Sequence, residues 1–318
     1  MKTRIVFFGT PAFAVPFLNT LVADQNIEIV AVVTQTDKPV GRKQVMTKPE
    51  VKIAAETLAV PILQFSTLKS SEAEQTLRNL HADVFVVVAY GKLIPRSILD
   101  IPENGCINVH PSLLPKYRGP SPIQHALLNG DSVTGVSIML LDEGMDTGPI
   151  LAQSMIELDP QETFSSLEKK ILTIAPILLN KTLHAFLQKS VSAIPQDEAH
   201  VSVTKLLERV DGQIDWTQDA QKIDQKIRAF ETWPGTWFSW NENEQVIRVS
   251  IHKAQPTDQL FEEPIGTCIS ESNHLYVVCG DKHIIELIEI QPEGKNKMPA
   301  IDYLRGHKTL LTTNLISS

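Results

Sequence analysis

Hydrophobic residues in the first 190 positions fall into two kinds of run. Short continuous runs, which predict buried strands of a parallel sheet, lie at residues 4–8, 27–33, 83–90, 105–110, 135–141 and 150–158. Runs of helical spacing, which predict helices between those strands, lie at residues 50–59, 121–129 and 163–188. This alternation predicts an α/β fold with a Rossmann-like, doubly wound, mostly parallel sheet. Ligands of such sheets bind beyond the carboxyl ends of the strands.

The hydrophobic pattern changes after about residue 190. Residues 190–207 are mixed and poor in helical spacing, so we expect a linker there. Beyond it, a helical run at 219–230 precedes short runs that predict strands separated by turns, at residues 246–252, 266–269, 275–279 and 284–290. We therefore predict one domain over residues 1–189 and, over residues 208–318, a smaller C-terminal β-barrel closed by a helix at 300–304.

The turn after the first strand reads Gly9-Thr10-Pro11-Ala12-Phe13. It lacks the glycine-rich fingerprint that holds the pyrophosphate of a dinucleotide, so a Rossmann-like topology does not imply such a cofactor here. We expect Thr10 to cap the following helix, with Pro11 in the first turn.

Composition and charge exclude several classes of protein. The net charge of −8 over 318 residues argues against a general nucleic-acid binder. No stretch approaches the roughly 20 apolar residues of a membrane span, and the N-terminal run is too short for a signal peptide. Cys106, Cys268 and Cys279 lack the spacing of a metal site, which predicts reduced thiols in the cytoplasm.

Basic residues are concentrated between Lys38 and Lys52. This segment contains five lysines and arginines and a single acid, Glu50. Such a loop is either a place where a phosphate backbone binds or an ordinary solvated surface, and charge alone leaves both interpretations open.

The most informative polar residues follow residue 105. In a strand over residues 106–110, two apolar side chains face one way, while Asn108 and His110 face the other way together. An amide donor beside an imidazole can polarise a carbonyl group and manage the proton that follows. Asp146 is the nearest downstream acid and lies in a glycine-flanked loop. This pattern predicts a site for acyl chemistry.

Several other residues have ordinary structural explanations. Cys106 shares the face of Asn108 and His110, but we expect it to be packed deeper in the strand and not to act as a nucleophile. We expect Tyr90 to pack beside a ligand rather than titrate, and His125 to be an ordinary helix residue. We expect three tryptophans of the C-terminal region to pack the barrel rather than to bind RNA: Trp216, Trp233 and Trp237.

Over nearly its whole length the chain resembles the folate-dependent formyltransferases. The resemblance is carried in the N-terminal part by Phe8-Gly9-Thr10-Pro11, Val88-Ala89-Tyr90-Gly91, Asn108-Val109-His110-Pro111-Ser112-Leu113-Leu114-Pro115, Arg118-Gly119 and Asp146-Thr147-Gly148. In the C-terminal part it is carried by Ile214-Asp215-Trp216, Arg228-Ala229-Phe230 and Trp233-Pro234-Gly235.

This resemblance implies a catalytic Rossmann-like domain followed by an oligonucleotide/oligosaccharide-binding-fold (OB-fold) domain that binds tRNA. It implies transfer of a formyl group from 10-formyltetrahydrofolate, a co-substrate, to the amine of methionine on initiator tRNA, without a metal and by a cytoplasmic monomer. The implied catalytic residues are Asn108, His110 and Asp146. The implied folate-contacting residues are Ser112, Leu113, Leu114 and Pro115, with Tyr90 and Gly91. Arg42 and Lys43 match the segment that approaches the tRNA acceptor stem.

The residues are consistent with this reaction. As a neutral amine attacks the formyl carbon, the Asn108 amide and a protonated His110 would stabilise the oxyanion, each such donor contributing about 3 kcal/mol in the transition state. Asp146 would raise the pKa of His110, or accept the proton of the amine through a water, or both.

The sequence also departs from the family pattern. Ala12 replaces an acid common in the first turn, and Arg42 is followed by Lys43-Gln44-Val45 where the loop commonly reads Gly-Arg-Gly-Lys-Lys. Residues 209–318 carry 11 bases and 16 acids. Because bases are the minority there, an RNA-facing stripe would have to be formed by a few of them. The candidates are Arg248, Lys253, Lys295, Lys297, Arg305 and Lys308.

Three rival interpretations remain open. A sugar-nucleotide N-formyltransferase shares the Asn-x-His and Asp core and can carry a similar barrel. A formyl-folate hydrolase performs the same chemistry with water as the acceptor. The third is a non-catalytic RNA-binding protein on an inactive core, but all three catalytic residues are present.

Overall fold

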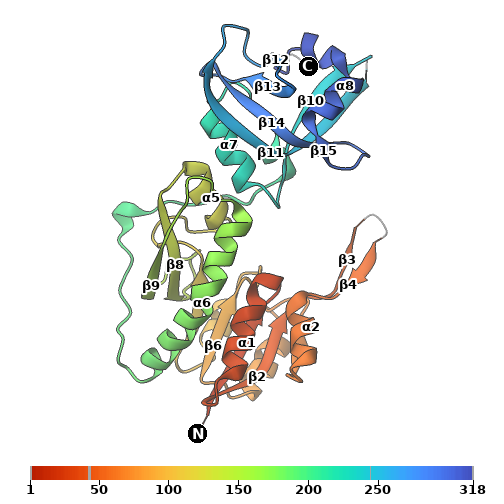
Figure 1. Cartoon of the computed structure of the whole chain (residues 1–318). Helices are drawn as coiled ribbons and strands as arrows, with labels where there is room; N and C mark the ends of the chain where they lie inside the picture. The colour runs from red at the N-terminus through yellow and green to blue at the C-terminus, as the bar shows by residue number, and fades with distance from the viewer. Residues whose placement is uncertain (1, 42–43, 244, 317–318) are drawn as a thin grey trace. The chain divides into compact units, whose positions relative to one another are not determined.

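The computed structural model describes residues 2–41, 44–243 and 245–316, which form two units (Figure 1). The first unit contains the residues up to Pro122, together with Val133–Glu157 and Lys169–Thr204. The second contains Ile123–Ser132, Leu158–Glu168 and the chain from Lys205 onward.

A seven-stranded sheet organises the first unit, in the order β5-β2-β1-β6-β7-β8-β9. Its strands are β1 (Thr3–Gly9), β2 (Ile27–Thr34), β5 (Ile62–Gln64), β6 (Val84–Val88), β7 (Cys106–His110), β8 (Val133–Leu140) and β9 (Ile150–Glu157). The five strands from β5 to β7 run parallel, whereas β8 and β9 are antiparallel to their neighbours. The predicted Rossmann-like, mostly parallel sheet is therefore confirmed.

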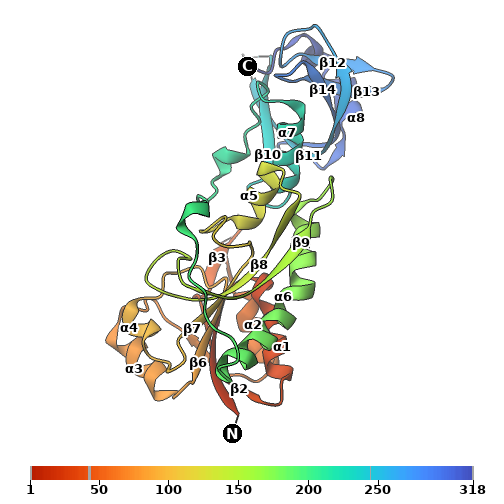
Figure 2. The same ribbon diagram turned by 90° about the vertical axis from the view of Figure 1, so that its left-hand side faces the viewer.

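Helices cover both faces of this sheet. They are α1 (Val15–Ala23), α2 (Glu50–Thr57), α3 (Ser71–Asn79), α4 (Arg96–Leu99) and α6 (Phe164–Leu187). In Figure 2, α3 and α4 lie on one side of the strands, and α1, α2 and α6 lie on the other. Val6 and Phe8 of β1 pack on the face that α3 covers, beside Leu77. Ile5 and Phe7 alternate with them and are fully buried too, which explains why β1 is a continuous hydrophobic run.

Thr10 does not cap a helix, contrary to our expectation. Pro11 precedes a short 3₁₀ helix, η1 (Ala12–Ala14), which has no side-chain cap, and α1 begins only at Val15. The hydroxyl of Thr10 instead donates to the carbonyl of Tyr90 at 2.8 Å, and therefore joins the chain after β1 to the chain after β6.

Some elements had little signal in the sequence. β3 (Lys38–Val40) and β4 (Val45–Thr47) form an antiparallel hairpin within the basic segment. Helix α3 is mostly polar and has only two fully buried apolar residues, and the Oγ of Ser70 caps it by accepting from the N–H of Ala73.

A six-stranded antiparallel sheet organises the second unit, with β15 pairing beside the path β10-β11-β14-β13-β12. Its strands are β10 (Thr236–Glu242), β11 (Gln245–Leu260), β12 (Cys268–Glu271), β13 (His274–Val278), β14 (His283–Pro292) and β15 (Met298–Pro299). The helices of this unit include α5 (Pro122–Asn129), α7 (Ala220–Ala229), α8 (Ala300–Gly306) and the 3₁₀ helix η4 (Lys308–Thr312).

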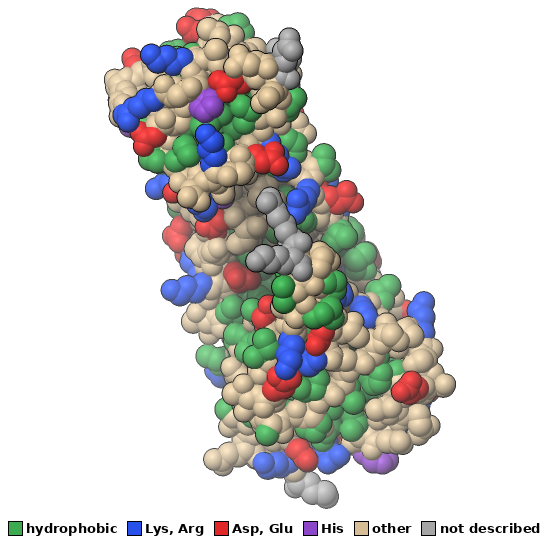
Figure 3. All heavy atoms as spheres, turned by 90° about the vertical axis from the view of Figure 1, so that its right-hand side faces the viewer, with side chains coloured by type: hydrophobic (Ala, Val, Ile, Leu, Met, Phe, Trp, Pro, Cys, Tyr) green, Lys and Arg blue, Asp and Glu red, His purple; other side chains and the backbone are tan. Residues whose placement is uncertain are grey.

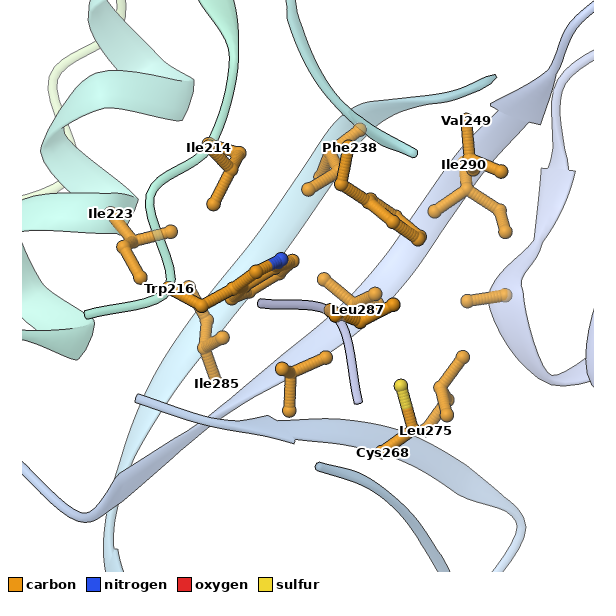
Figure 4. Packing of buried hydrophobic residues seen from close by; sticks show 14 of the residues in the cluster. Ile214, Trp216, Ile223, Phe238, Val249, Cys268, Leu275, Ile285, Leu287 and Ile290 are labelled. Carbon is orange, nitrogen blue, oxygen red and sulfur yellow. The ribbon is translucent and has the colours of Figure 1, made fainter. Parts of the chain in front are cut away.

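The core of the second unit is almost entirely apolar. Trp216, Phe238 and Leu287 meet at its centre (Figure 4). Helix η4 contacts both end strands, β10 and β12, and buries Leu310, so it fills the gap between the edges of the sheet. This arrangement agrees with the predicted small C-terminal barrel. In the parts of the chain described above, no helix is long and apolar enough to cross a membrane.

Candidate active site

Asn108 and His110 lie at the carboxyl end of β7, in the middle of the first unit's sheet. Asn108 pairs in register with Val87 of β6, and His110 with Ser137 of β8. Because the two residues are two positions apart in one strand, their side chains leave the same face of the sheet. Both are largely buried, with 9% and 4% of their surfaces exposed, so a substrate carbonyl here would meet them with little competing water.

Asp146 reaches this pair from the loop between β8 and β9. Its Oδ2 lies 3.5 Å from Nδ1 of His110 and accepts a hydrogen bond of 2.8 Å from the backbone N–H of Gly119. The structure therefore brings together the three residues that the sequence predicted. Asp146 adopts a left-handed backbone conformation with φ of 56°, which is uncommon for a residue with a side chain.

The other ring nitrogen of His110 determines its tautomer. Nε2 lies 2.8 Å from the carbonyl oxygen of Tyr117. A carbonyl can only accept, so Nε2 carries a hydrogen and donates it. In the neutral ring, Nδ1 is then left with its lone pair, facing Asp146.

Burial lowers the pKa of His110 below its ordinary value. The Asp146 carboxylate and the hydrogen bond to Tyr117 act in the opposite direction, but they do not outweigh the loss of water around the ring. Asp146 therefore acts on the pKa of His110 in the expected direction, but burial, which the sequence did not reveal, has the larger effect. The imidazole is neutral at the start of a reaction near pH 7.

The turn Ser112–Pro115 is fixed mainly by β8 and β9. Leu114 donates its N–H to Oγ of Ser137 at 3.0 Å, and its carbonyl accepts from the Gln153 amide at 2.9 Å. Ser112 and Leu114 are buried, while Leu113 and Pro115 are partly exposed. Among these four residues, Leu113 and Pro115 therefore present the more accessible side chains.

Tyr90 and Gly91 follow β6, on the same side of the sheet as the turn from β7. Tyr90 is buried with its ring edge-on to Phe8, and its hydroxyl finds no hydrogen-bond partner among the described residues. Gly91 is exposed and has a φ of 77°, in the left-handed region that suits glycine. Tyr90 is thus a core residue whose backbone, rather than its ring, borders the exposed turn.

A cavity of about 440 Å³, in the size range of small-molecule sites, is lined in part by the elements that carry the three polar residues. It shares the strand β7 and the β8–β9 loop with them. Its walls are Arg96, Leu99, Asp100, Glu103, Asn104, Gly105, Cys106, Leu140, Leu141, Asp142, Glu143 and Phe186. None of these residues was predicted from the sequence to contact a ligand. Their closeness in sequence to the candidate catalytic residues could have identified some of them, since Cys106 precedes Asn108 by two residues and Asp142 precedes Asp146 by four.

Cys106 lines this cavity without the properties of a nucleophile. Burial raises the pKa of its thiol to about 12, so the thiolate is essentially absent at neutral pH. The expectation that Cys106 is packed agrees with this environment.

The basic segment predicted to meet tRNA is described on both sides of Arg42 and Lys43. Arg42 and Lys43 lie outside the described residues. Near them, Lys48 pairs with Glu56 and Lys52 with Asp37, each at 2.8 Å, so acids balance part of the basic segment. Figure 3 shows cationic and anionic side chains interspersed over the described part of one face.

Some of the cationic residues proposed for an RNA-facing stripe in the second unit contact other side chains of the same unit. The guanidinium of Arg248 lies 3.9 Å from the centre of the Trp237 ring, and Arg305 pairs with Asp302 at 2.7 Å. Trp216 is buried in the core, whereas Trp233 is 46% exposed. The packing expected for the tryptophans therefore holds for Trp216 but not for Trp233.

No group of three or more potential metal ligands among histidine, cysteine and acidic residues occurs in the described ranges.

Comparison with known proteins gives the family. Residues 3–183 match Formyl transferase, and residues 206–308 match Formyl transferase, C-terminal domain. A methionyl-tRNA formyltransferase from Roseiflexus sp. (strain RS-1) is 44% identical over 306 residues, which cover 96% of this chain and 93% of the relative. The chain belongs to the methionyl-tRNA formyltransferase family.

Further comparisons extend this assignment. The methionyl-tRNA formyltransferase of Roseiflexus castenholzii is 42% identical, with 96% of each chain covered. A sugar 3N-formyl transferase, solved in the presence of dTDP and 5-N-formyl-THF, is similar in fold with a TM-score of 0.67 at 20% identity, covering 93% of this chain and 100% of that one. The methionyl-tRNA formyltransferase family thus shares its fold with enzymes that formylate other amines.

Proposed function

We propose that the protein transfers the formyl group of 10-formyltetrahydrofolate to the free amine of methionyl-initiator tRNA. The observation that carries this proposal is the grouping of Asn108, His110 and Asp146, with Nδ1 of His110 3.5 Å from the Asp146 carboxylate. An amide donor and a neutral base on one face of a strand, with a carboxylate beside the base, suit the transfer of an acyl group to an amine. The family membership supports the same reaction.

Asn108 stabilises the charge that develops on the formyl oxygen. 10-Formyltetrahydrofolate supplies the formyl group as an electrophilic carbonyl. The amide of Asn108 is held on a central strand and is shielded from bulk water, so it needs little reorganisation to donate to an oxyanion.

His110 accepts the proton that the attacking amine loses. Its pKa is lowered by burial, so Nδ1 is free to take this proton. The imidazolium that forms is stabilised by the Asp146 carboxylate and by the Tyr117 carbonyl, the two groups that favour its charged form. His110 can therefore stabilise the oxyanion, as expected, once it has accepted this proton. From Nδ1, the proton can be returned to the leaving nitrogen.

The cavity described above is our candidate site for the flat, amino-substituted ring of the folate. Leu99, Leu141 and Phe186 provide apolar walls, while the carboxylates of Asp142 and Glu143 can accept from ring N–H groups. Leu113 and Pro115 would contact the remainder of the co-substrate. The six residues Ser112–Pro115, Tyr90 and Gly91 remain our proposed folate-binding set, now extended by this cavity.

We propose that the first unit catalyses the reaction and that the second unit, with Arg42 and Lys43, meets the tRNA. We also propose a monomer in the cytoplasm. The three cysteines are buried and unpaired, which fits a reducing compartment.

One assay separates this proposal from its rivals. The protein is incubated with 10-formyltetrahydrofolate and, in parallel, with charged initiator tRNA, an amino-sugar nucleotide, or no acceptor. Formylation of the methionyl-tRNA is the expected result. Formylation confined to the sugar would replace the proposed acceptor, and turnover of the folate without any acceptor would indicate a hydrolase.

A further inference from the structure

The segment that the sequence predicted as a linker is bonded to the active site. Residues 194–204, which we call the strap, belong to the first unit and run as a largely extended chain after α6 (Figure 1). The strap begins with a pair of backbone hydrogen bonds of 2.8 Å between Ile194 and Ile150. It is therefore fixed to the sheet edge before it reaches the site.

The second half of the strap holds the segment Tyr117–Gly119. The N–H of Tyr117 donates to Oγ of Ser202 at 2.8 Å, and the N–H of Arg118 donates to the Ser202 carbonyl at 2.9 Å. The N–H of Thr204 donates to the carbonyl of Arg118 at 2.7 Å. This is the segment whose carbonyl at Tyr117 holds His110 and whose N–H at Gly119 holds Asp146.

The first half of the strap holds the loop that carries Asp146. The side-chain amide of Gln196 donates through Nε2 to the backbone carbonyls of both Asp146 and Gly148, each at 2.7 Å. Its Oε1 accepts from Nε of Arg118 at 3.0 Å. Gln196 thus uses both ends of its amide to join the two segments that contact the imidazole and the carboxylate.

Arg118 connects these two sets of contacts. It lies between Tyr117 and Gly119 in sequence, and only 5% of its surface is exposed. Its guanidinium also binds Glu198 of the strap, at 2.7 Å through Nη2. A buried guanidinium needs such partners, so its three bonds to the strap keep the whole Tyr117–Gly119 segment in one place.

The held residues need this support because their backbones are in costly conformations. Tyr117 has a φ of 62° and Asp146 a φ of 56°. For residues with side chains, such conformations persist only where surrounding contacts determine them. The strap supplies those contacts.

We propose that Gln196 and Arg118 are positioning residues for formyl transfer, and that the strap sets the distance between His110 and Asp146. This inference rests on the proposed function, because the positions that it fixes are those of the base and the acid. Neither residue needs to touch a substrate.

The main test is Gln196→Ala in the full chain, assayed with 10-formyltetrahydrofolate and charged initiator tRNA. We expect kcat to fall about 10- to 100-fold, as for catalytic groups displaced by about 1 Å, while KM for both substrates stays within about twofold. The matched control is His200→Ala, an exposed strap residue that pairs with Asp197, and its kcat should equal that of the wild type.

A double-mutant cycle with Asp146→Asn shows whether Gln196 acts through that residue. If it does, adding Gln196→Ala to Asp146→Asn lowers kcat further by less than about threefold. If the two losses multiply in full, the positioning role is wrong and Gln196 merely supports the fold.

Folding of the variants is checked by thermal unfolding. Should Gln196→Ala unfold below the assay temperature, Gln196→Glu provides the comparison, because it keeps the volume and the acceptor for Arg118 but loses both donated bonds. An unchanged kcat in a folded variant would overturn the inference alone. A wild-type protein without any formyl transfer to the tRNA would overturn the proposed function and the inference together.

Discussion

Strands β7 and β14 are both central, buried strands, but they place different side chains in the interior. In β14, the buried positions are apolar, including Ile285, Leu287 and Ile290. On one face of β7, by contrast, an apolar Cys106 is followed by Asn108 and His110. A buried polar group without partners costs free energy, so the polar face of β7 is maintained for chemistry and the apolar interior of β14 for stability.

The difference extends to what surrounds each strand. Around β14, close packing of apolar side chains fills the core, and the aliphatic side chains among them make no hydrogen bonds. Around β7, by contrast, His110 donates to the Tyr117 carbonyl, and Gly119 and Gln196 donate to Asp146, so that hydrogen bonds fix single orientations. Substitutions in β7 should therefore change activity more than stability, and those in β14 stability more than activity.

The strongest test of this contrast is His110→Ala. Loss of the base should lower kcat by about 10²- to 10⁴-fold. Binding of 5-formyltetrahydrofolate, measured by calorimetry, should survive because the proposed cavity does not include this ring. If kcat falls by less than about tenfold, then β7 does not carry the proton transfer and the contrast with β14 fails.

Asn108→Ala should have the next largest effect. Removal of one oxyanion donor typically costs about 10²- to 10³-fold in kcat. KM for the folate should change little, because this hydrogen bond gains strength only as charge develops. A variant with raised KM and unchanged kcat would instead make Asn108 a residue for substrate binding.

Leu287→Ala sharpens the other side of the comparison. Leu287 is buried in the core of the second unit, so its truncation should lower the free energy of unfolding by about 2–5 kcal/mol. Urea unfolding measures this loss. Below the transition, kcat at saturating tRNA should remain within about twofold of wild type, and a larger drop would show that this core also shapes the reaction.

The smallest expected effect is on the stability of the fold at acidic pH. It concerns Asp24, which belongs neither to the proposed active site nor to the core of the second unit. Asp24 accepts from His184 at 2.7 Å and from Asn180 at 2.9 Å, and chiefly the bond from His184 lowers its pKa from 3.8 to about 2. Because the folded pKa is depressed, this stabilisation is present above pH 3.8 and is lost as the pH falls towards 2.

For Asp24→Asn we therefore expect a loss of about 1–2 kcal/mol at pH 5. The difference from wild type should narrow at pH 4 and again at pH 3, as measured by urea unfolding at each pH. A difference that does not change with pH would mean that the carboxylate charge is not what stabilises this contact.

The sequence predicted packing and chemistry through different patterns. Strands such as β1 and β6 could be predicted because both faces are apolar and the hydrophobic runs are continuous. The trio could be predicted because alternation in β7 places Asn108 and His110 on one face and because the family motif includes Asp146.

Other features could not be predicted because they depend on distant contacts. Gln196 meets Asp146 and Arg118 across 50 and 78 positions of sequence, and no periodicity records such contacts. Likewise, the sign of the pKa shift of His110 depends on how much burial outweighs a nearby carboxylate. The sequence predicts that His110 and Asp146 lie close together, but not how completely water is excluded from around them.

The course of the strap determines where this chain can be shortened. A chain that ends at residue 189 would keep the Tyr117–Gly119 segment and the loop of Asp146 but lose Gln196, Ser202 and Thr204, the partners that hold them. A chain that ends after Thr204 would keep them all. Any attempt to isolate the first unit, or to exchange the second unit for that of a relative, should therefore place the junction between Thr204 and Lys205.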